Sequence, residues 1–133
     1  MDDVKVYVET EINPTESEEK VKRAVENVFG NIPTEIKPLS KGNLLTAEVE
    51  GIESFTKLYN LLRRERIRDA TRTVLYEGID SKTIVFFLNK QVAYAGHVSF
   101  SKETAESPLG PIKVKVTCKN PKEFIDWLAP KTT

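Results

Sequence analysis

The side chains with the clearest chemistry in this chain are arginines gathered in one short stretch. Between residues 57 and 72, six side chains are basic and two are acidic, although the whole chain carries 20 basic and 20 acidic residues. Guanidinium groups stay charged, and their paired N–H donors match the oxygens of a phosphate or a carboxylate. A basic segment in a neutral chain therefore indicates either a surface for an anionic partner or a solvated face laced with internal ion pairs.

The spacing of three arginines favours the anionic partner. Arg64, Arg68 and Arg72 follow each other at four-residue intervals, which predicts that they line one face of a helix. Like charges at this spacing oppose each other by about 0.2–0.5 kcal/mol per pair, so helix stability alone does not favour the arrangement. We therefore expect this face to contact phosphates. The alternative is that the arginines pair with carboxylates elsewhere in the fold, such as those of the acidic helix predicted near the N-terminus.

A second polar cluster follows a hydrophobic strand. Asn89, Lys90 and Gln91 stand together, with Tyr94 and His97 close behind. Amide and ammonium groups can bind base edges or phosphates, and a tyrosine ring can stack on a base. The alternative interpretation is a polar turn that leaves a buried strand, with Tyr94 packed in the core.

Residues for catalysis or metal binding are few. The chain has one histidine, His97, and one cysteine, Cys118, so zinc sites built on two histidines or on several thiolates are excluded. The sequence contains no G-x-S-x-G motif and no glycine-rich phosphate loop. We therefore expect a non-catalytic protein with no cofactor and no metal. An enzyme acting on a small anionic substrate would need a pocket that joins Lys90 to His97.

Composition predicts one globular domain over residues 1–133. Hydrophobic residues make up 39% of the 133 positions and charged residues 30%, enough for a single core. No apolar run approaches the roughly 18 residues of a membrane span, and the acidic N-terminus does not resemble a targeting peptide. Cys118 cannot form an internal disulfide and is predicted to be a buried, inert thiol, which indicates the cytoplasm.

Alternating and β-branched segments predict a sheet. The run 83–88 is apolar throughout and is predicted to be buried on both faces. Residues 101–111 are rich in proline, glycine and serine, which predicts an exposed loop. The predicted strands are 4–8, 32–37, 43–50, 83–88, 98–100 and 112–118.

Helical periodicity predicts helices between these strands. Asn13 to Glu16 is typical of a helix start, and Gly30 of its end. Its apolar stripe consists of Val21, Ala24, Val25, Val28 and Phe29. Two further apolar sets follow. At 100° per residue around a helix axis, their faces differ in direction by roughly 130°. The first set is Phe55, Leu58, Tyr59 and Leu62, and the second is Ile67, Ala70, Val74 and Leu75.

The phase difference predicts a break between residues 63 and 66. A last helix starts at Asn120-Pro121 and turns Phe124, Trp127 and Leu128 inward. The strands and helices do not follow a βαβ rhythm. This indicates an α+β fold, a single-domain sandwich of helices packed on a largely antiparallel sheet.

Four segments of the chain resemble an archaeal family of small uncharacterised proteins. They are Ile12–Val21, Leu62–Arg72, Phe87–Phe100 and Ser107–Val114, and the likeness spans most of the chain. Members of that family are grouped with predicted RNA-binding and exosome-associated proteins, and are similar in fold to the fifth protein of the large ribosomal subunit. The resemblance implies an RNA-related role and carries over to Arg63, Arg64, Arg68, Arg72, Asn89, Lys90 and Gln91.

The sequence therefore predicts a non-catalytic domain that binds RNA or a ribonucleoprotein complex. Arg64, Arg68 and Arg72 would contact phosphates, and Lys90 with Gln91 would add polar contacts. The alternative is a protein-interaction module or homodimer that uses strand 83–88 and loop 101–111 instead of binding nucleic acid.

Overall fold

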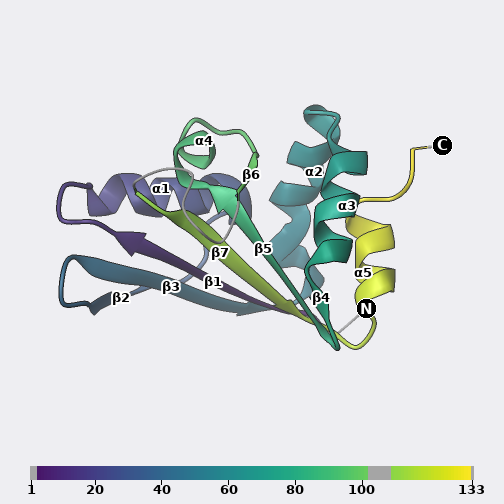
Figure 1. Cartoon of the computed structure of the whole chain (residues 1–133), viewed down its shortest axis with the longest axis horizontal. Coiled ribbons are helices and arrows are strands. Elements are labelled where there is room, and N and C mark those ends of the chain that lie inside the picture. The colour runs from purple at the N-terminus through teal and green to yellow at the C-terminus, as the bar shows by residue number, and fades with distance from the viewer. Residues whose placement is uncertain (1–2, 102–108, 133) are drawn as a thin grey trace.

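A computed structural model describes residues 3–101 and 109–132 and shows a mixture of helices and an antiparallel sheet (Figure 1). The sheet has seven strands in this part of the chain, in the order β2-β3-β1-β7-β5-β4, with β6 paired to β5. The strands are β1 Lys5–Ile12, β2 Glu35–Pro38, β3 Asn43–Glu50, β4 Ile79–Asp80, β5 Thr83–Asn89, β6 Phe100–Ser101 and β7 Pro111–Thr117. The predicted α+β class is confirmed.

The helices form two groups. Figure 1 shows α1 and α4 together toward one end of the sheet, and α2, α3 and α5 grouped toward the other. The α-helices are α1 Glu18–Phe29, α2 Thr56–Arg64, α3 Arg68–Glu77, α4 Lys90–Tyr94 and α5 Pro121–Leu128, and a 3-10 turn, η1 Ile52–Phe55, leads into α2.

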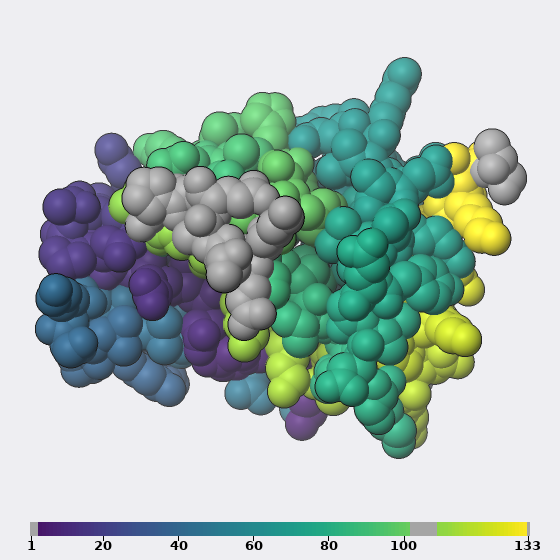
Figure 2. All heavy atoms as spheres, viewed as in Figure 1, coloured from purple at the N-terminus to yellow at the C-terminus, as the bar shows by residue number. Residues whose placement is uncertain are grey.

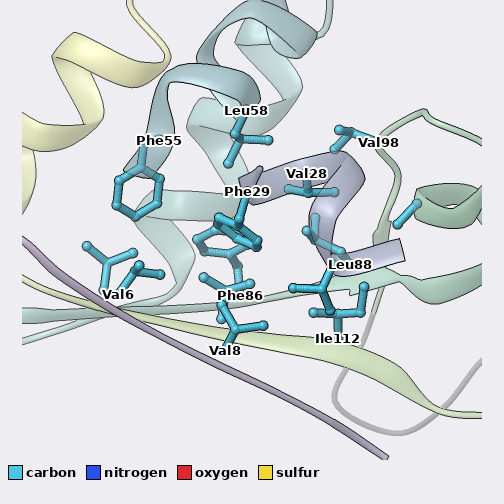
Figure 3. Packing of buried hydrophobic residues seen from close by; sticks show 14 of the residues in the cluster. Val6, Val8, Val28, Phe29, Phe55, Leu58, Phe86, Leu88, Val98 and Ile112 are labelled. Atoms are coloured by element: carbon cyan, nitrogen blue, oxygen red, sulfur yellow. The ribbon is translucent and has the colours of Figure 1, made fainter. Parts of the chain in front are cut away.

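The core lies between the helices and one face of the sheet. In β7, every second side chain is fully buried, and the predicted apolar stripe of α1 is buried as a whole. Phe29, Phe55 and Phe86 gather at the centre of this layer (Figure 3). The Phe55 ring meets Phe29 edge-on at 6.1 Å between centroids and Phe124 at 4.9 Å, a geometry that adds to the hydrophobic burial of aromatic side chains.

Helix α1 begins later than the sequence predicted. Its N-cap is Ser17, whose side chain accepts a hydrogen bond from the Lys20 backbone. Asn13 to Glu16 forms a turn instead, in which the Glu16 carboxylate accepts from the Asn13 backbone N–H at 3.0 Å. The same carboxylate is also bound by Lys90, at 2.9 Å. The capping pattern was recognised, but this contact from a distant residue was not visible in the sequence.

Strand β5 is not buried on both faces, which corrects the sequence prediction. Its burial alternates, with Ile84, Phe86 and Leu88 buried and the intervening residues half-buried, because the helices cover one side of the sheet. The strand pairs with β7 on one side and with β4 and β6 on the other. The protein-interaction alternative, which placed a docking edge at this strand, stays untested. Most of the predicted loop 101–111 lies outside the described residues.

The break between the second and third helices is confirmed. Helix α2 ends at Arg64 and α3 begins at Arg68, with Arg66 in the left-handed region at φ 56°. The prediction that Arg64 shares one helical face with Arg68 and Arg72 was wrong, since Arg64 belongs to α2. Ala70 is exposed, and Thr71 is the buried residue of that turn.

We predict that Phe55→Ala lowers the free energy of unfolding by about 3–5 kcal/mol, because it removes a fully buried ring that two other rings contact. Chemical denaturation would measure the change. The exposed Leu39 (41% exposed) is the control, and Leu39→Ala should shift stability by no more than about 0.5 kcal/mol. Equal losses of stability in the two variants would contradict this description of the core.

Candidate nucleic-acid interface

The junction of α2 and α3, residues 63–68, is called the arginine elbow below. The chain leaves α2 through hydrogen bonds from Arg66 N to Arg63 O (3.3 Å) and from Ile67 N to Leu62 O (3.2 Å). Arg66 occupies a left-handed backbone conformation that is uncommon for any residue with a side chain. This conformation reverses the chain direction and leaves the Arg66 side chain exposed. Figure 2 shows teal side chains of this region standing out at the upper edge of the molecule.

A hollow of about 400 Å³ opens beside the elbow and is lined by Arg63, Arg66, Arg68, Asp69 and Thr132. The Asp69 carboxylate accepts a hydrogen bond from the Thr132 hydroxyl at 2.6 Å. Within residues 3–101 and 109–132, neither the Arg66 nor the Arg68 guanidinium has a hydrogen bond or an ion pair. Three guanidinium groups therefore line one hollow, and Asp69 supplies the one side-chain carboxylate among its described lining residues.

Among the described residues, Arg63 is the one of these three arginines whose guanidinium has hydrogen-bond partners. The group lies over the Tyr59 ring, 3.3 Å from the centroid, and donates to the carbonyls of Tyr59 and Leu128 at 3.1 and 3.2 Å. Burial lowers the pKa of Arg63, and the nearby charge of Arg68 lowers it further, against an opposite effect of Tyr59. The group stays protonated. The repulsion between Arg63 and Arg68 is what a bound anion would relieve.

Arg72 faces away from the hollow and holds α5. Its guanidinium forms an ion pair with Asp126 at 2.7 Å and donates to the Ala129 carbonyl at 3.2 Å. The side chain is only 16% exposed, and it also lies beside the Tyr76 ring. Arg72 and Arg63 thus both bind carbonyls at the C-terminal end of α5, where backbone acceptors lack partners within the helix.

Arg64 connects the elbow to the segment that follows α4. Its guanidinium donates to the Gly96 carbonyl at 3.0 Å. The neighbouring Glu65 accepts from the Val98 backbone at 3.2 Å and contacts the His97 ring at 3.2 Å. These contacts place α4 and the elbow along the same edge of the molecule (Figure 1).

The second predicted cluster lies at the start of α4, apart from the hollow. Asn89 caps α4, its side chain accepting from Val92 N at 3.0 Å, and Gln91 is exposed. Lys90 is buried, with only 4% of its side chain exposed. Its ammonium donates to the Glu11 and Leu109 carbonyls at 2.6 and 2.8 Å and to Glu16 at 2.9 Å. All three ammonium protons are used inside the protein, so none faces a ligand.

Glu16 is the counterion of Lys90, and sequence reasoning missed this role. Burial alone would raise the pKa of its carboxyl group. The hydrogen bonds from Asn13 and from Lys90, together with the charge of Lys90, outweigh burial and hold the pKa below its ordinary value. The carboxylate is therefore ionised at neutral pH. The only sequence signal was the position of Glu16 in a capping pattern, which gave no indication of its partner.

A second hollow, of about 360 Å³, lies between α1 and α4 above this ion pair. Its lining residues are Thr15, Glu16, Ser17, Lys20, Val21, Ala24, Lys90, Gln91, Tyr94 and Leu109. His97 is not among them, and its ring lies against Glu65 instead. The hollow does not join Lys90 to His97 in the way that the enzyme hypothesis required.

The structure thus divides the predicted residues among three places. Arg63, Arg64 and Arg68 belong to the elbow, and Arg72 belongs to the α5 contact. Lys90 and Gln91 belong to α4, and Asn89 is its N-cap. Arg66 was absent from the predicted site, because its position in the break between two helical patterns gave it no face to share. Whether these residues bind RNA stays a prediction.

Other kinds of site receive no support in the described ranges. No cluster of three or more histidine, cysteine, aspartate or glutamate side chains is placed to hold a metal ion among residues 3–101 and 109–132. Over the same part of the chain, no helix has the length and apolar character needed to cross a membrane. Cys118 is buried as predicted, and burial raises the pKa of its thiol.

Comparison with known proteins identifies the family of this chain. A family model described as RNA binding matches residues 5–118. A UPF0201 protein from Pyrobaculum islandicum is 45% identical over 130 residues, which cover 97% of this chain and 91% of that protein. A UPF0201 protein from Sulfurisphaera tokodaii is 43% identical over 130 residues, which cover 96% of this chain and 88% of that protein. The chain belongs to the UPF0201 family, whose archaeal members are uncharacterised.

Solved structures agree with this assignment. The crystal structure of a UPF0201 protein from Methanococcus jannaschii superposes with a TM-score of 0.85 at 31% identity, covering 97% of this chain and 95% of that one. A second crystal structure of an uncharacterised UPF0201 protein gives a TM-score of 0.80 at 34% identity, covering 96% and 94%. The fold and the family are therefore shown together.

We predict that Arg72→Ala lowers the free energy of unfolding by about 1–3 kcal/mol, because it leaves the Ala129 carbonyl after α5 and the Asp126 carboxylate without this partner. Arg66→Ala should change stability by no more than about 0.5 kcal/mol, since the exposed Arg66 side chain has no hydrogen bond or ion pair among the described residues. Thermal and urea unfolding of both variants would measure this difference. A larger destabilisation by Arg66→Ala than by Arg72→Ala would contradict the division of roles.

We predict that Glu16 makes stability depend on acid. Because its pKa is lowered on folding, the stabilisation it gives is complete above the unfolded-state pKa of about 4.3 and is lost as pH falls through the folded-state value. Urea unfolding of the native protein and Glu16→Gln should therefore differ most near pH 7, and the difference should shrink as pH falls below about 4.3. A difference that stays constant from pH 7 to pH 3 would show that ionisation of Glu16 is not involved.

Proposed function

We propose that this protein binds RNA without acting on it chemically, through the arginine elbow. The observation that carries the proposal is the hollow beside the elbow, which three guanidinium groups line and where Arg66 and Arg68 have no carboxylate partner among the described residues. Arginine forks bind phosphate oxygens in pairs and remain charged at any physiological pH. The description of the family model, RNA binding, supports the same class of partner.

In this proposal the arginines have different tasks. Arg66 and Arg68 bind phosphates directly, and Arg64 flanks them while it holds the Gly96 carbonyl. Arg63 contributes positive potential from the wall of the hollow, since its own donors already bind backbone carbonyls. Arg72 acts indirectly by fixing α5. The predicted phosphate ladder of one helix is thus replaced by a pocket at the junction of two.

The charge balance bears on the kind of binding that we propose. The chain has equal numbers of acidic and basic side chains, so long-range attraction to a polyanion is weak and the local field of the elbow must direct it. We therefore propose a small number of phosphate contacts and a salt dependence of matching size. RNA held in a ribonucleoprotein complex, including the exosome-associated complexes implied by the resemblance, offers the same phosphates. The free, buried Cys118 supports a place in the reducing cytoplasm.

We predict that Arg66→Ala with Arg68→Ala weakens binding to a mixed pool of single-stranded and structured RNA. Fluorescence anisotropy at several salt concentrations should give a plot of log K against log salt that is shallower by about 0.7 for each single-stranded phosphate that the variant no longer binds. The weakening should be similar for all RNA sequences, because phosphates carry no sequence information.

Lys41→Ala is the matched control for this experiment. Lys41 is exposed in the turn between β2 and β3, at the end of the sheet away from the elbow (Figure 1), so its replacement should leave the slope unchanged. An unchanged slope in a folded elbow variant, or a slope that falls equally in the control, would overturn the assignment of the elbow.

A further inference from the structure

The hollow between α1 and α4 has features that the elbow lacks. Val21, Ala24 and Leu109 give it an apolar wall, whereas Glu16 and Lys90 place charge at its base. Its volume of about 360 Å³ falls within the range of small-ligand sites, about 300–1,000 Å³. A flat, mostly apolar group with polar atoms at its edge fits such a lining, and a nucleobase is a group of this kind.

Tyr94 stands at the side of this hollow with 46% of its surface exposed. Tyr94 is one of the large hydrophobic side chains that the described part of the chain leaves exposed. Its backbone is fixed, because Asn27 of α1 donates to the Ala93 and Tyr94 carbonyls at 2.9 and 3.0 Å. The Lys20 ammonium lies 6.0 Å from the centre of the ring. A ring held at the mouth of a hollow beside a cation can stack on a base while the cation meets the adjoining phosphate.

Glu16 supplies an acceptor at the base of the hollow. Its Oε1 atom accepts the hydrogen bonds from Asn13 and Lys90, and among the described residues its Oε2 atom accepts none. A carboxylate oxygen can accept a hydrogen bond only from a donor. Adenine, cytosine and guanine carry an exocyclic amino group that can donate to it, whereas uracil presents its one N–H between two carbonyl oxygens that a carboxylate repels.

A contact from the elbow also reaches the segment beside this hollow. Tyr94 stands two residues before Gly96, whose carbonyl is bound by Arg64 of the elbow. Figure 1 shows α4 and the junction of α2 and α3 on the same upper edge. The Arg64–Gly96 contact therefore brings the elbow next to the segment that follows Tyr94.

We propose that the hollow between α1 and α4 binds one unstacked, amino-bearing base of a single-stranded RNA, with Tyr94 stacked on the base, Lys20 beside its phosphate and Glu16 accepting from its amino group. The proposal rests on the RNA-binding function argued above and adds a base-binding site to it. Bases that leave their stack in single-stranded RNA are commonly held by an aromatic ring and hydrogen bonds to their edges.

The test compares short single-stranded oligonucleotides of adenosine and of uridine on the full chain, by fluorescence anisotropy. We expect tighter binding of the adenosine oligonucleotide. Tyr94→Ala should weaken that binding by about tenfold, because the ring no longer stacks on the base, while leaving the salt slope unchanged, because every phosphate stays bound. Tyr94→Phe keeps the ring and should retain the affinity. A 2-aminopurine placed in the oligonucleotide should be quenched by the native protein and by Tyr94→Phe, but not by Tyr94→Ala.

The outcomes separate the base site from the elbow. If Tyr94→Ala leaves both affinity and quenching unchanged while Arg66→Ala with Arg68→Ala weakens binding, the base site is overturned and the RNA-binding elbow stands. Weaker binding with Tyr94→Ala but not with the elbow variant supports the base site and overturns the elbow. Equal binding of adenosine monophosphate and the oligonucleotide would overturn the proposal in favour of a free-nucleotide site. No binding of any RNA at low salt would overturn both.

Discussion

The buried ammonium of Lys90 is the interaction on which the packing around the start of α4 depends. A lysine taken out of water is strongly destabilising unless each of its protons finds an acceptor, and here two carbonyls and one carboxylate supply them. Those acceptors belong to β1, to the turn before α1 and to residue 109. One charged group therefore ties the start of α4 to β1 and to the turn before α1, and Asn27 of α1 adds its own hydrogen bonds to the end of α4.

Basic side chains of this region differ in whether the protein itself supplies their hydrogen-bond acceptors. Arg63, Arg72 and Lys90 bind backbone carbonyls or single carboxylates and hold elements together. Arg66 and Arg68 lie where two helices meet, and their guanidinium groups have no acceptor among the described residues. The internal contacts expected of the basic stretch are thus found for Arg63 and Arg72, whereas binding of an anionic partner by Arg66 and Arg68 stays a proposal.

Sequence patterns predicted the features that depend on residues close together in the chain. The stripe of α1, the alternation of β7, the cap at Asn120 and the break before Arg68 each depend on neighbours a few residues away. The fold class followed from them. The errors came where a distant partner decided the outcome. Glu16 turned toward Lys90, 74 residues away, and Arg72 toward the end of α5, 57 residues away.

The same reasoning explains why the contacts of the predicted site residues could not be read from the sequence. Charge counts along the sequence located the basic region. They could not distinguish an arginine that donates hydrogen bonds to the protein's own carbonyls from one that does not. Arg66 shows the difficulty, because it belongs to neither helical pattern and owes its exposure to a left-handed backbone at the break. Net charge is no better guide. Carboxylates such as Asp126 and Glu65 are placed against the protein's own donors, so a neutral chain can still present a positive surface where donors remain free.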